Sequence, residues 1–461
     1  MKKNKNTNLK FPRKVYLILL ALLLVAFLAA SLTRYFDHDE FETIHTVWKI
    51  VQGERIYVDF FQHHHPFFYY LLAPFVLIFR DSILTLFAAR VFIFFLTLLI
   101  LASTYLLGRK IFNSRISFLA IILLATTFIF NEKVVEIRTD TIQTLFSLAS
   151  LVFLFDFLEN GKARSLILSG AGLGFSFLFL QKAIFLIFLV CLLLLYYFWQ
   201  RKISGRHLLI FGLSFLLTLF PYIVYLLLTK NFSTYLFFNW VFNFNFVGHF
   251  YPFRHLAESF RENSLLWIFC AWGCLVFLKT HRQKNLAFLS LGLLLSLFFV
   301  RVPLKQYFMT LMPLIALISS QGLYFTFKNN QKLLLIIFLF LTVPFIYSSL
   351  KPLETTINRN QLALVKDVLQ ATNEEDFVYD GSARFNLFRK DIDFFWFSVN
   401  PTDSCLATYK KLRPCDYDIN ELIEEKKPKI VSTYPAPVDL RRLEKHYKPF
   451  KNYPNVFIRI N

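Results

Sequence analysis

The sequence predicts an all-α polytopic membrane protein of about eleven transmembrane helices, followed by a small α/β domain outside the membrane. Three observations carry this prediction. The 461 residues are 56% hydrophobic and 19% aromatic, with 59 Phe and only 13 Gly. Apolar runs of spanning length recur at short intervals. Basic residues gather in the short loops between these runs, and the composition changes after residue 350.

The first apolar run covers residues 15–33 and follows the basic segment MKKNKNTNLKFPRK. Its length is close to that needed to cross a bilayer, which favours an uncleaved anchor. A basic head, an apolar centre and the small residues of FLAAS also fit a cleaved signal peptide. Under either interpretation, Arg34 lies outside the cytoplasm.

Ten further spans follow along the chain. We expect them near residues 82–107, 116–130, 140–158, 165–180, 183–199, 207–229, 263–279, 285–300, 304–326 and 332–350. With a basic N-terminus inside, an odd number of spans places the C-terminal region outside. The segments assigned to the inside hold 19 Lys/Arg and one acid, Glu159, in agreement with the positive-inside rule. The net charge of +20 therefore indicates membrane orientation and not nucleic-acid binding.

Residues 66–79 are apolar but short for a span, and Pro74 interrupts them. Counting them as a span would invert the charge rule in every later loop, so we predict an interfacial or re-entrant helix. Residues 351–461 alternate charged helical patterns, as in VLQATNEEDFVYD, with short β-branched runs, as in KIVSTY. This predicts two domains, a membrane domain at 1–350 and an extracytoplasmic α/β domain at 351–461. Cys405 and Cys415 of the outer domain either form a disulfide or remain free.

Four polar features are predicted to share the outer face of the membrane. They are the acidic loop 34–65, the loop NEKVVEIRTD (131–140), the helix break at Lys182 and the segment RVPLKQY (301–307). Acids that face water cost little, so a solvated loop is expected for Glu42, Glu54 and Asp59.

Three other acids, Asp39, Glu136 and Asp140, stand beside apolar helix starts. Desolvation is costly there, and ionisable groups in such places usually mark a site.

Basic side chains on the same face suit a lipid that carries a phosphate. The candidates are Arg138, Lys182, Arg301 and Lys305, with Tyr307 beside the last of them. Cations at the membrane boundary can hold a phosphate while its tail stays in lipid. A carboxylate opposite them can take a proton from an attacking hydroxyl. One base suffices for displacement with inversion, because a lipid phosphate leaves without much protonation.

Structural alternatives exist for three of these positions. Lys182 can be a snorkelling side chain at a turn, and Arg138 can pair with Glu136. Arg90, near the outer end of a span, is either a phosphate ligand or an anchor.

Several segments resemble, in the same order, those of family 39-type glycosyltransferases of the GT-C fold. That group includes the aminoarabinose transferase of lipid A and protein O-mannosyltransferases. The segments are FDHDEFETIH, HHHPFFYYLLAP, EIRTDTIQTLF, the break at Lys182 and KQYFMTLMPLIAL. Each motif is short, and the resemblance rests on their order and shared face across roughly residues 15–350. It implies a GT-C-like fold for the membrane domain.

The resemblance implies roles for the acids of the first outer loop. Asp39 matches the Asp of the family's Asp-Glu pair, so it is the candidate general base. Glu40 would orient Asp39 or the acceptor, and Asp37 is close enough to take the role of base. These two aspartates are not ranked by the resemblance.

Two later positions are also matched. His65 stands where relatives place a polar or basic residue before Pro, so it would contact the donor phosphate. An interfacial loop is the alternative for the His triplet, since three adjacent His rarely bind one metal. Asp140 matches the second family acid, which would bind a divalent cation or pair with Arg138 or Lys182. Because some GT-C enzymes use a metal and others do not, the cofactor stays open.

The implied function is that of an inverting glycosyltransferase in the cell (inner) membrane. It would move a sugar from a polyprenyl-phosphate donor to a lipid, glycan or protein acceptor on the extracytoplasmic face, with a cytoplasmic N-terminus. A transporter or flippase of a lipid-linked glycan would also need membrane cations and outer acids. That class is expected to carry internal repeats or helices broken deep in the bilayer, and the sequence has no convincing repeat. A scaffold whose outer domain binds a partner would leave Asp39 and Asp140 unexplained.

Overall fold

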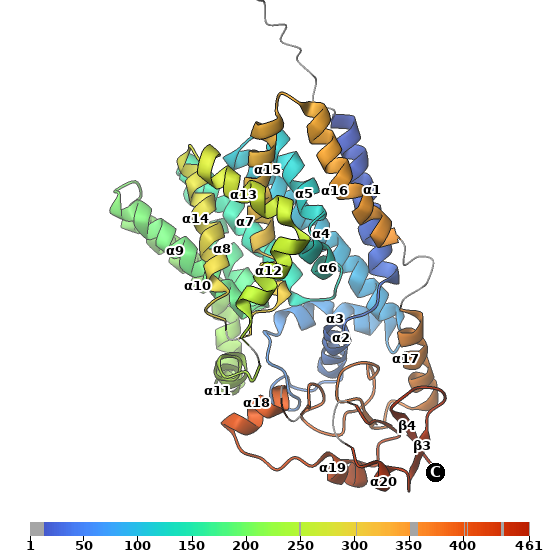
Figure 1. Cartoon of the computed structure of the whole chain (residues 1–461). Helices are drawn as coiled ribbons and strands as arrows, with labels where there is room; N and C mark the ends of the chain where they lie inside the picture. The colour runs from blue at the N-terminus through green and yellow to red at the C-terminus, as the bar shows by residue number, and fades with distance from the viewer. Residues whose placement is uncertain are drawn as a thin grey trace, which may run out of the picture.

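The computed structural model describes residues 13–248, 250–300, 302–350, 358–400, 402, 404–434 and 438–460. Figure 1 shows a bundle of long helices above a smaller domain that carries the short strands. The N-terminal trace leaves from the top of the bundle, and the C-terminus lies in the lower domain. This arrangement is the predicted one, an all-α membrane part followed by a small α/β domain.

The bundle is built from apolar helices that correspond to the predicted spans. In chain order they are α1 (Arg13–Thr33), α4 (Leu84–Ile111), α5 (Ser114–Ala125), α6 (Phe128–Val134), α7 (Thr139–Asn160), α8 (Ala163–Phe179), α9 (Ile184–Trp199), α10 (Gly205–Leu228), α13 (Ser264–Phe277), α14 (His281–Ser296), α15 (Leu311–Phe327) and α16 (Gln331–Leu350). Within the described residues, five helices are long and apolar enough to cross a membrane, and the bent pair α5–α6 makes a sixth. Every predicted span overlaps one of these elements, which confirms the polytopic prediction.

Two spans differ from the prediction in detail. The run at 116–130 is not one straight helix, because α5 and α6 meet at an angle of 70°. At the break, the Phe128 N–H donates 3.0 Å to the Asn263 side chain, which supplies a partner outside the helix. The span predicted at 304–326 begins only at Leu311, because the 3₁₀ turn η3 (Lys305–Phe308) precedes α15. Both changes shape the face of the bundle that was predicted to lie outside the membrane.

The first outer loop forms two helices between the bundle and the lower domain (Figure 1). These are α2 (His38–Val51) and α3 (Phe67–Phe79). α2 begins at a capping box, in which Asp37 accepts from the Asp39 N–H and Glu40 accepts from the Asp37 N–H. α3 covers the apolar run that was predicted to be an interfacial or re-entrant helix, and it exposes Leu77 and Ile78.

Shorter elements connect the helices of the bundle. They are the 3₁₀ turn η1 (Gln181–Ala183), α11 (Phe232–Leu236), the π-helical turn η2 (Phe237–Phe242) and α12 (Pro252–Glu262).

The C-terminal domain combines four short helices with a four-stranded sheet. The helices are α17 (Arg359–Ala371), α18 (Cys405–Leu412), α19 (Ile419–Lys426) and α20 (Leu440–Leu443), and the strands are β1 (Val378–Tyr379), β2 (Ile430–Ser432), β3 (Tyr447–Pro449) and β4 (Val456–Arg459). The strand order is β1-β2-β4-β3. β1 and β2 are parallel, while β4 runs antiparallel to both of its neighbours, with Val431 opposite Phe457. Cys405 is buried and Cys415 is exposed, and both are free.

The apolar interior has two parts. One lies within the helix bundle, and the other joins α2 and α3 to the C-terminal domain. Main-chain contacts cross this second core, since the Phe61 N–H donates to the Phe394 carbonyl and the Trp396 indole N–H donates to the Phe61 carbonyl, both at 3.0 Å. The first outer loop and the C-terminal domain therefore pack as one body. The predicted boundary after residue 350 adjoins residues 351–357, which lie outside the described residues.

Candidate active site

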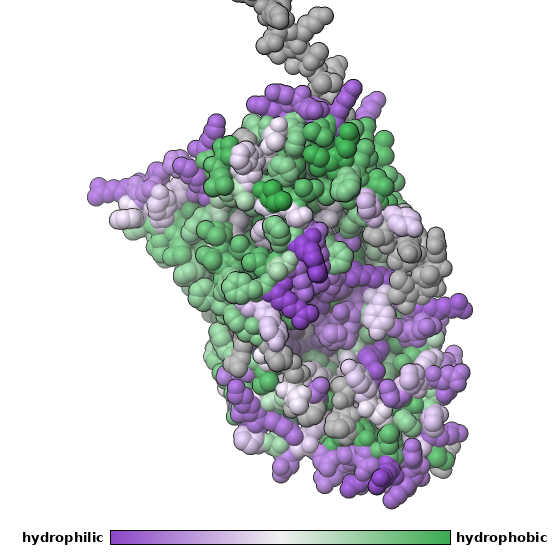
Figure 2. Space-filling model, in the orientation of Figure 1, coloured by the Kyte–Doolittle hydropathy of each residue, from purple (hydrophilic) through white to green (hydrophobic). Residues whose placement is uncertain are grey.

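A cavity of about 930 Å³ lies between the helix bundle and the C-terminal domain. Figure 2 shows hydrophilic side chains gathered in a recess between the apolar surface of the bundle and the lower domain. Its polar walls come from α2, the loop after α2, the segment before α7, and η1. A further wall comes from the C-terminal domain through Ser382, Arg384, Ser398, Asn400, Cys405 and Tyr434. All four polar features predicted to share the outer face contribute to this one cavity.

Three carboxyl groups of α2 and its cap line the cavity: Asp37, Asp39 and Glu42. Asp39 has two cationic neighbours, the Arg138 guanidinium at 2.5 Å and the His38 imidazole at 3.0 Å. Burial alone would raise the pKa of the Asp39 carboxyl, but these neighbours outweigh it and hold that pKa well below the usual range. Asp39 is therefore ionised across the physiological range.

Glu40 takes a different position from its neighbours. It is fully buried and does not line the cavity. The Arg90 guanidinium donates to both of its oxygens, at 2.8 and 2.6 Å, and the Ile137 N–H donates at 2.9 Å. Arg90 also donates to main-chain carbonyls at the end of α1, so it is a structural anchor. Glu40 thus fixes α2 against α4 and against the segment before α7.

Arg138 is the central cation of the site. It caps α7, is nine-tenths buried, and reaches Asp39 at 2.5 Å, Glu136 at 3.3 Å and Asp140 at 3.5 Å. The predicted Glu136–Arg138 pair is present, and Arg138 also lines the cavity. Glu136 lies behind the cavity wall, beside Lys133. Burial raises the pKa of Glu136 to about 7, with Arg138 and Lys133 acting against that shift.

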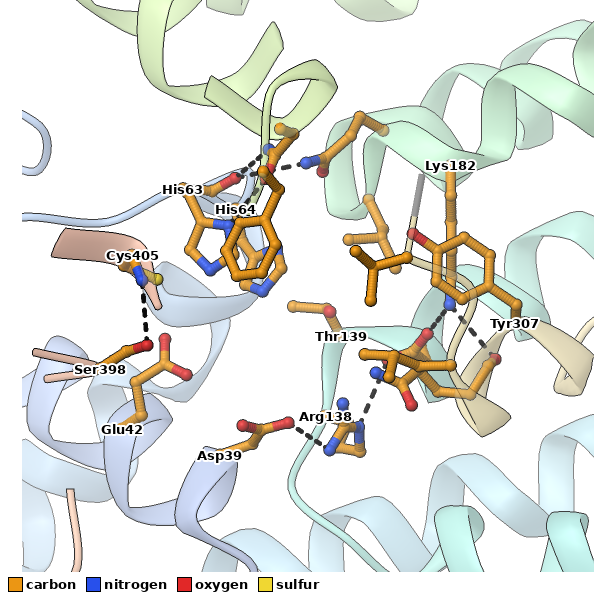
Figure 3. Close-up of a pocket in the computed structure, with 18 of the residues that line it drawn as sticks. Asp39, Glu42, His63, His64, Arg138, Thr139, Lys182, Tyr307, Ser398 and Cys405 are labelled. Carbon is orange, nitrogen blue, oxygen red and sulfur yellow. Dashed lines mark hydrogen bonds and ion pairs between the residues drawn. The ribbon is translucent and has the colours of Figure 1, made fainter. Parts of the chain in front are cut away.

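Lys182 and Asp140 pair directly across the junction of α7 and η1. The Lys182 ammonium also donates 3.2 Å to the Gln306 carbonyl and lies 4.5 Å from the centre of the Tyr307 ring. Figure 3 shows Lys182 and Tyr307 on one side of the cavity, with Arg138 below them and Asp39 opposite. Asp140, Lys182 and Tyr307 were predicted to share one face of the bundle, and in the structure they lie together in the cavity lining.

The His triplet divides into two roles. His63 and His64 line the cavity with their rings tilted against each other, 4.1 Å between centres. His65, the expected phosphate contact, is fully buried outside the cavity lining. Its ring bonds the Phe177 carbonyl at 2.7 Å and the Tyr235 hydroxyl at 3.0 Å, so both nitrogens are engaged. Burial lowers the pKa of His65 to about 4. The structure therefore places a neutral, structural His65 behind a pair of cavity histidines.

One other expected cation falls elsewhere. Lys305 does not line the cavity and lies 3.6 Å from Glu132 and 3.8 Å from Glu262. Arg301 lies outside the described residues.

Glu42 was expected in a solvated loop, and that expectation is wrong. Its residue is only 5% exposed, whereas the side chains of Glu54 and Asp59 are 31% and 34% exposed. The C-terminal domain closes over this part of α2, which no local pattern in the sequence could indicate. Sequence reasoning also missed Gln62, which is fully buried and donates 2.7 Å to Glu42.

One group of side chains has the geometry to hold a cation. The ligand atoms of Asp37, His38 and Asp39 all lie within 4.8 Å of one another, and carboxylate oxygens suit hard divalent cations. Asp39 already faces the Arg138 guanidinium, so a divalent cation here would compete with that ion pair.

Comparisons with known proteins agree with this arrangement. Residues 63–225, about a third of the chain, match the family model described as dolichyl-phosphate-mannose-protein mannosyltransferase. The matched region contains the His triplet, Arg138, Asp140 and Lys182 of the cavity region. A search of curated protein sequences finds no significant match.

Solved structures show the same fold. ArnT from Cupriavidus metallidurans, bound to undecaprenyl phosphate, superposes with a TM-score of 0.63 at 12% identity, covering 90% of this chain and 91% of that one. Its apo state gives 0.65 at 12% identity, covering 91% and 92%. The apo oligosaccharyltransferase from Archaeoglobus fulgidus gives 0.57 at 13% identity, covering 90% and 69%. These matches confirm the GT-C-like fold and, with the family model, the resemblance found in the motifs.

Proposed function

We propose that this protein is an integral-membrane glycosyltransferase that moves a sugar from a polyprenyl-phosphate donor to an acceptor on the extracytoplasmic face. The observation that carries the proposal is a single cavity in which ion-paired cations and carboxylates lie beside an apolar wall. The family match over residues 63–225 and the fold shared with ArnT support the same class. The sugar, hexose or pentose, is left open.

The donor phosphate is assigned to Arg138 and Lys182, with Tyr307 beside them. Arg138 offers a planar fork of donors, and Lys182 offers a compact charge, which together can hold a phosphate through charge-assisted hydrogen bonds. The prenyl chain would lie on the apolar wall next to Lys182. That wall is formed by Ile184, Phe185, Trp240, Phe244, Phe298 and Phe299. Phe244 and Phe299 are strongly exposed, as expected for side chains that face lipid.

The chemistry is a single displacement with inversion at the anomeric carbon. Asp39 is the proposed general base, because it lines the cavity across from Lys182 and stays ionised through Arg138 and His38. The acceptor oxygen bonds to the sugar C1 as the C1–O bond to phosphate breaks. The leaving phosphate gains charge, and Arg138 and Lys182 stabilise that charge.

The proposed location is the cell (inner) membrane, with a cytoplasmic N-terminus and an extracytoplasmic C-terminal domain. The distribution of basic loops supports this orientation, as does the position of the cavity on the acid-rich side of the bundle. We also keep the division into domains 1–350 and 351–461, with the first outer loop packed on the second domain. The acceptor is proposed to be a lipid, a glycan or a protein.

The first test is a transfer assay with radiolabelled polyprenyl-phosphate sugars and crude envelope acceptors. The wild type should move label to an acceptor, while Asp39→Asn should lose transfer by at least about a hundredfold and keep donor binding. Asp59→Asn, which removes an exposed acid paired with Arg55, is the matched control and should transfer normally. Near-normal turnover in Asp39→Asn would remove Asp39 as the base. No transfer from any donor by the wild type would contradict the proposed function.

A further inference from the structure

Glu42 is a buried cavity carboxyl to which the resemblance gives no role. It stands three residues after Asp39, so both side chains lie on the same face of α2. Figure 3 shows the two carboxylates extending from that helix, with Arg138 beyond Asp39 and with Ser398 and Cys405 beyond Glu42. An acid placed this deep beside the proposed base needs either a structural or a chemical reason.

A hydrogen-bond network holds Glu42 in one orientation. Gln62 donates its amide N–H groups to Glu42 at 2.7 Å and to the Thr46 hydroxyl at 3.1 Å. The Gln62 carbonyl accepts the backbone N–H groups of His63 at 2.7 Å and His64 at 3.3 Å. Gln62 thus ties Glu42 to the loop that carries the cavity histidines. Among the described residues, this amide is the one hydrogen-bond donor to the Glu42 carboxyl, which leaves its second oxygen free toward the cavity.

The two carboxyl groups have opposite electrostatic surroundings. Asp39 has Arg138 and His38 within ion-pair distance, whereas no cation lies within that distance of Glu42 in the described parts of the chain. The charged and titratable groups that influence Glu42 are Asp39 and His38 on α2, Arg138 before α7, Tyr69 on α3 and Cys405 on α18. Burial and the nearby Asp39 charge raise the pKa of Glu42 to about 8, while the pKa of Asp39 is held well below its usual range.

We propose that Glu42 is a second proton-transfer residue of this site, which takes over from Asp39 the proton that the acceptor hydroxyl releases. The inference rests on the proposed glycosyl transfer. The acceptor O–H bond breaks as its oxygen bonds to the sugar C1. The C1–O bond to the lipid phosphate breaks, and its electron pair stays on the phosphate oxygen. The proton passes through Asp39 to the Glu42 carboxylate and leaves to water before the next turnover.

The direction of this transfer follows from the environments of the two acids. A carboxylate held by a guanidinium is a weak base, so a proton on Asp39 is readily lost. Glu42 is the stronger base of the two, and its pKa is close to the working pH, where a proton-transfer group is most effective. Asp39 then regains its ion pair with Arg138, which restores the site for a new donor. Proton transfer from Asp39 to Glu42 is favourable because burial and charge separate the pKa values of the two carboxyl groups.

The pH dependence has a defined sign. Glu42 must be ionised to take the proton, so the turnover rate should fall as the pH drops below about 8. Two nearby groups titrate in the same region. His38, held by Asp39, has its pKa raised to about 9, and burial raises that of Glu136 to about 7. The wild-type profile alone therefore does not identify Glu42, and the variants must do so.

The test measures transfer of labelled sugar over many turnovers by the full-length protein between about pH 6 and about pH 9, together with binding of the labelled donor. Glu42→Gln should lower the rate about a hundredfold, leave donor affinity unchanged, and lose the dependence on pH near 8. Glu42→Asp should recover part of the rate and keep a rising limb. Asp59→Asn should match the wild type in both measurements.

Each outcome decides the proposal. If Glu42→Gln keeps the wild-type rate and pH profile, Glu42 is not a proton-transfer residue. If Glu42→Gln and Glu42→Asp both lose donor binding as well as rate, Glu42 is structural and the proposal fails. Absence of transfer in the wild type would instead overturn the proposed function. These failures are distinguishable because the wild-type rate and donor binding are measured separately.

Discussion

Single side chains on α7 mark the two ends of the bundle. Asp140, in its first turn, pairs with Lys182 at the cavity, while Asp156, near its last turn, pairs with Lys110 at 2.5 Å. The two pairs have the same chemistry but lie at opposite ends of α7. The proposed donor phosphate can therefore reach only the first pair. This gives a matched comparison for the role of Lys182.

Lys182→Ala should weaken donor binding by roughly tenfold to a hundredfold, since a charge-assisted hydrogen bond contributes about 1.5–3 kcal/mol. A phosphate contact made equally in the ground and transition states raises KM and leaves kcat nearly unchanged. Lys110→Ala should leave KM for the donor as in the wild type. Steady-state kinetics with varied donor concentration provides the measurement, and an unchanged KM in Lys182→Ala would assign this lysine to structure alone.

Residue patterns predicted much of the site. Asp39, Arg138, Asp140 and Lys182 were expected on one face, and they meet at one cavity. The resemblance implied that Glu40 orients Asp39 or the acceptor, and only the fold shows that Glu40 turns inward to Arg90. The sequence also could not reveal the environment of Glu42, which is set by Gln62 and by a domain far along the chain. Burial by distant segments leaves no local signal.

The helices themselves were largely predictable. In lipid every backbone polar group needs an internal hydrogen-bond partner, so a long apolar run forms a helix. The break between α5 and α6 was not predictable, because no Gly or Pro interrupts LATTFIF. At the break, the Phe128 N–H donates to the Asn263 side chain, which comes from a later segment. The charges in the loops predicted the order and orientation of the helices. Contacts between elements determine where the helices bend and where they end.

At the scale of elements, α13 and α15 cross closely at two glycines. A Cβ atom at Gly322 would lie 2.5 Å from the Phe269 carbonyl oxygen and 3.3 Å from the Gly273 nitrogen. Both neighbours are backbone atoms, so a methyl group cannot be accommodated by a side-chain rotation. Small residues at such crossings let membrane helices approach closely.

Gly322→Ala should therefore destabilise the bundle by about 1–3 kcal/mol through overpacking, and the apparent melting temperature in detergent should fall. Gly212→Ala on α10 is the control, because nothing lies within 4 Å of its added Cβ atom. Alanine is the better helix former there, so the melting temperature should stay the same or rise slightly. Equal behaviour of the two variants would mean that the α13–α15 crossing tolerates expansion.

At the scale of the whole molecule, the cavity exists because the C-terminal domain packs on α2. A buried polar cluster fixes this contact. Asp391 accepts from His45 at 2.8 Å, from Lys49 at 2.9 Å and from Asn386 at 2.9 Å, and its side chain is 6% exposed. The cluster lies in the core shared by the first outer loop and the C-terminal domain, so it should hold the outer wall of the site in place.

Asp391→Asn removes the charge that His45 and Lys49 face, and it should destabilise the packed C-terminal domain by about 3 kcal/mol, as expected when a buried pair loses one partner. Burial opposes ionisation of Asp391, but His45 and Lys49 outweigh it and lower its pKa. A lowered pKa stabilises the fold above the unfolded value of about 3.9, and this stabilisation is lost as the pH falls through the folded pKa. The difference in melting temperature between wild type and variant should therefore be largest near neutral pH and become smaller at acidic pH.

The control is Glu375→Gln, which removes an exposed acid paired with Lys390 in the same domain and should change the melting temperature little. Transfer activity adds a second readout, because loosening the wall that carries Ser398 and Cys405 should lower turnover together with stability. A melting difference that persists unchanged at low pH would show that the charge of Asp391 is not what secures the domain. Loss of activity without loss of stability would instead mean that Asp391 acts on the cavity directly.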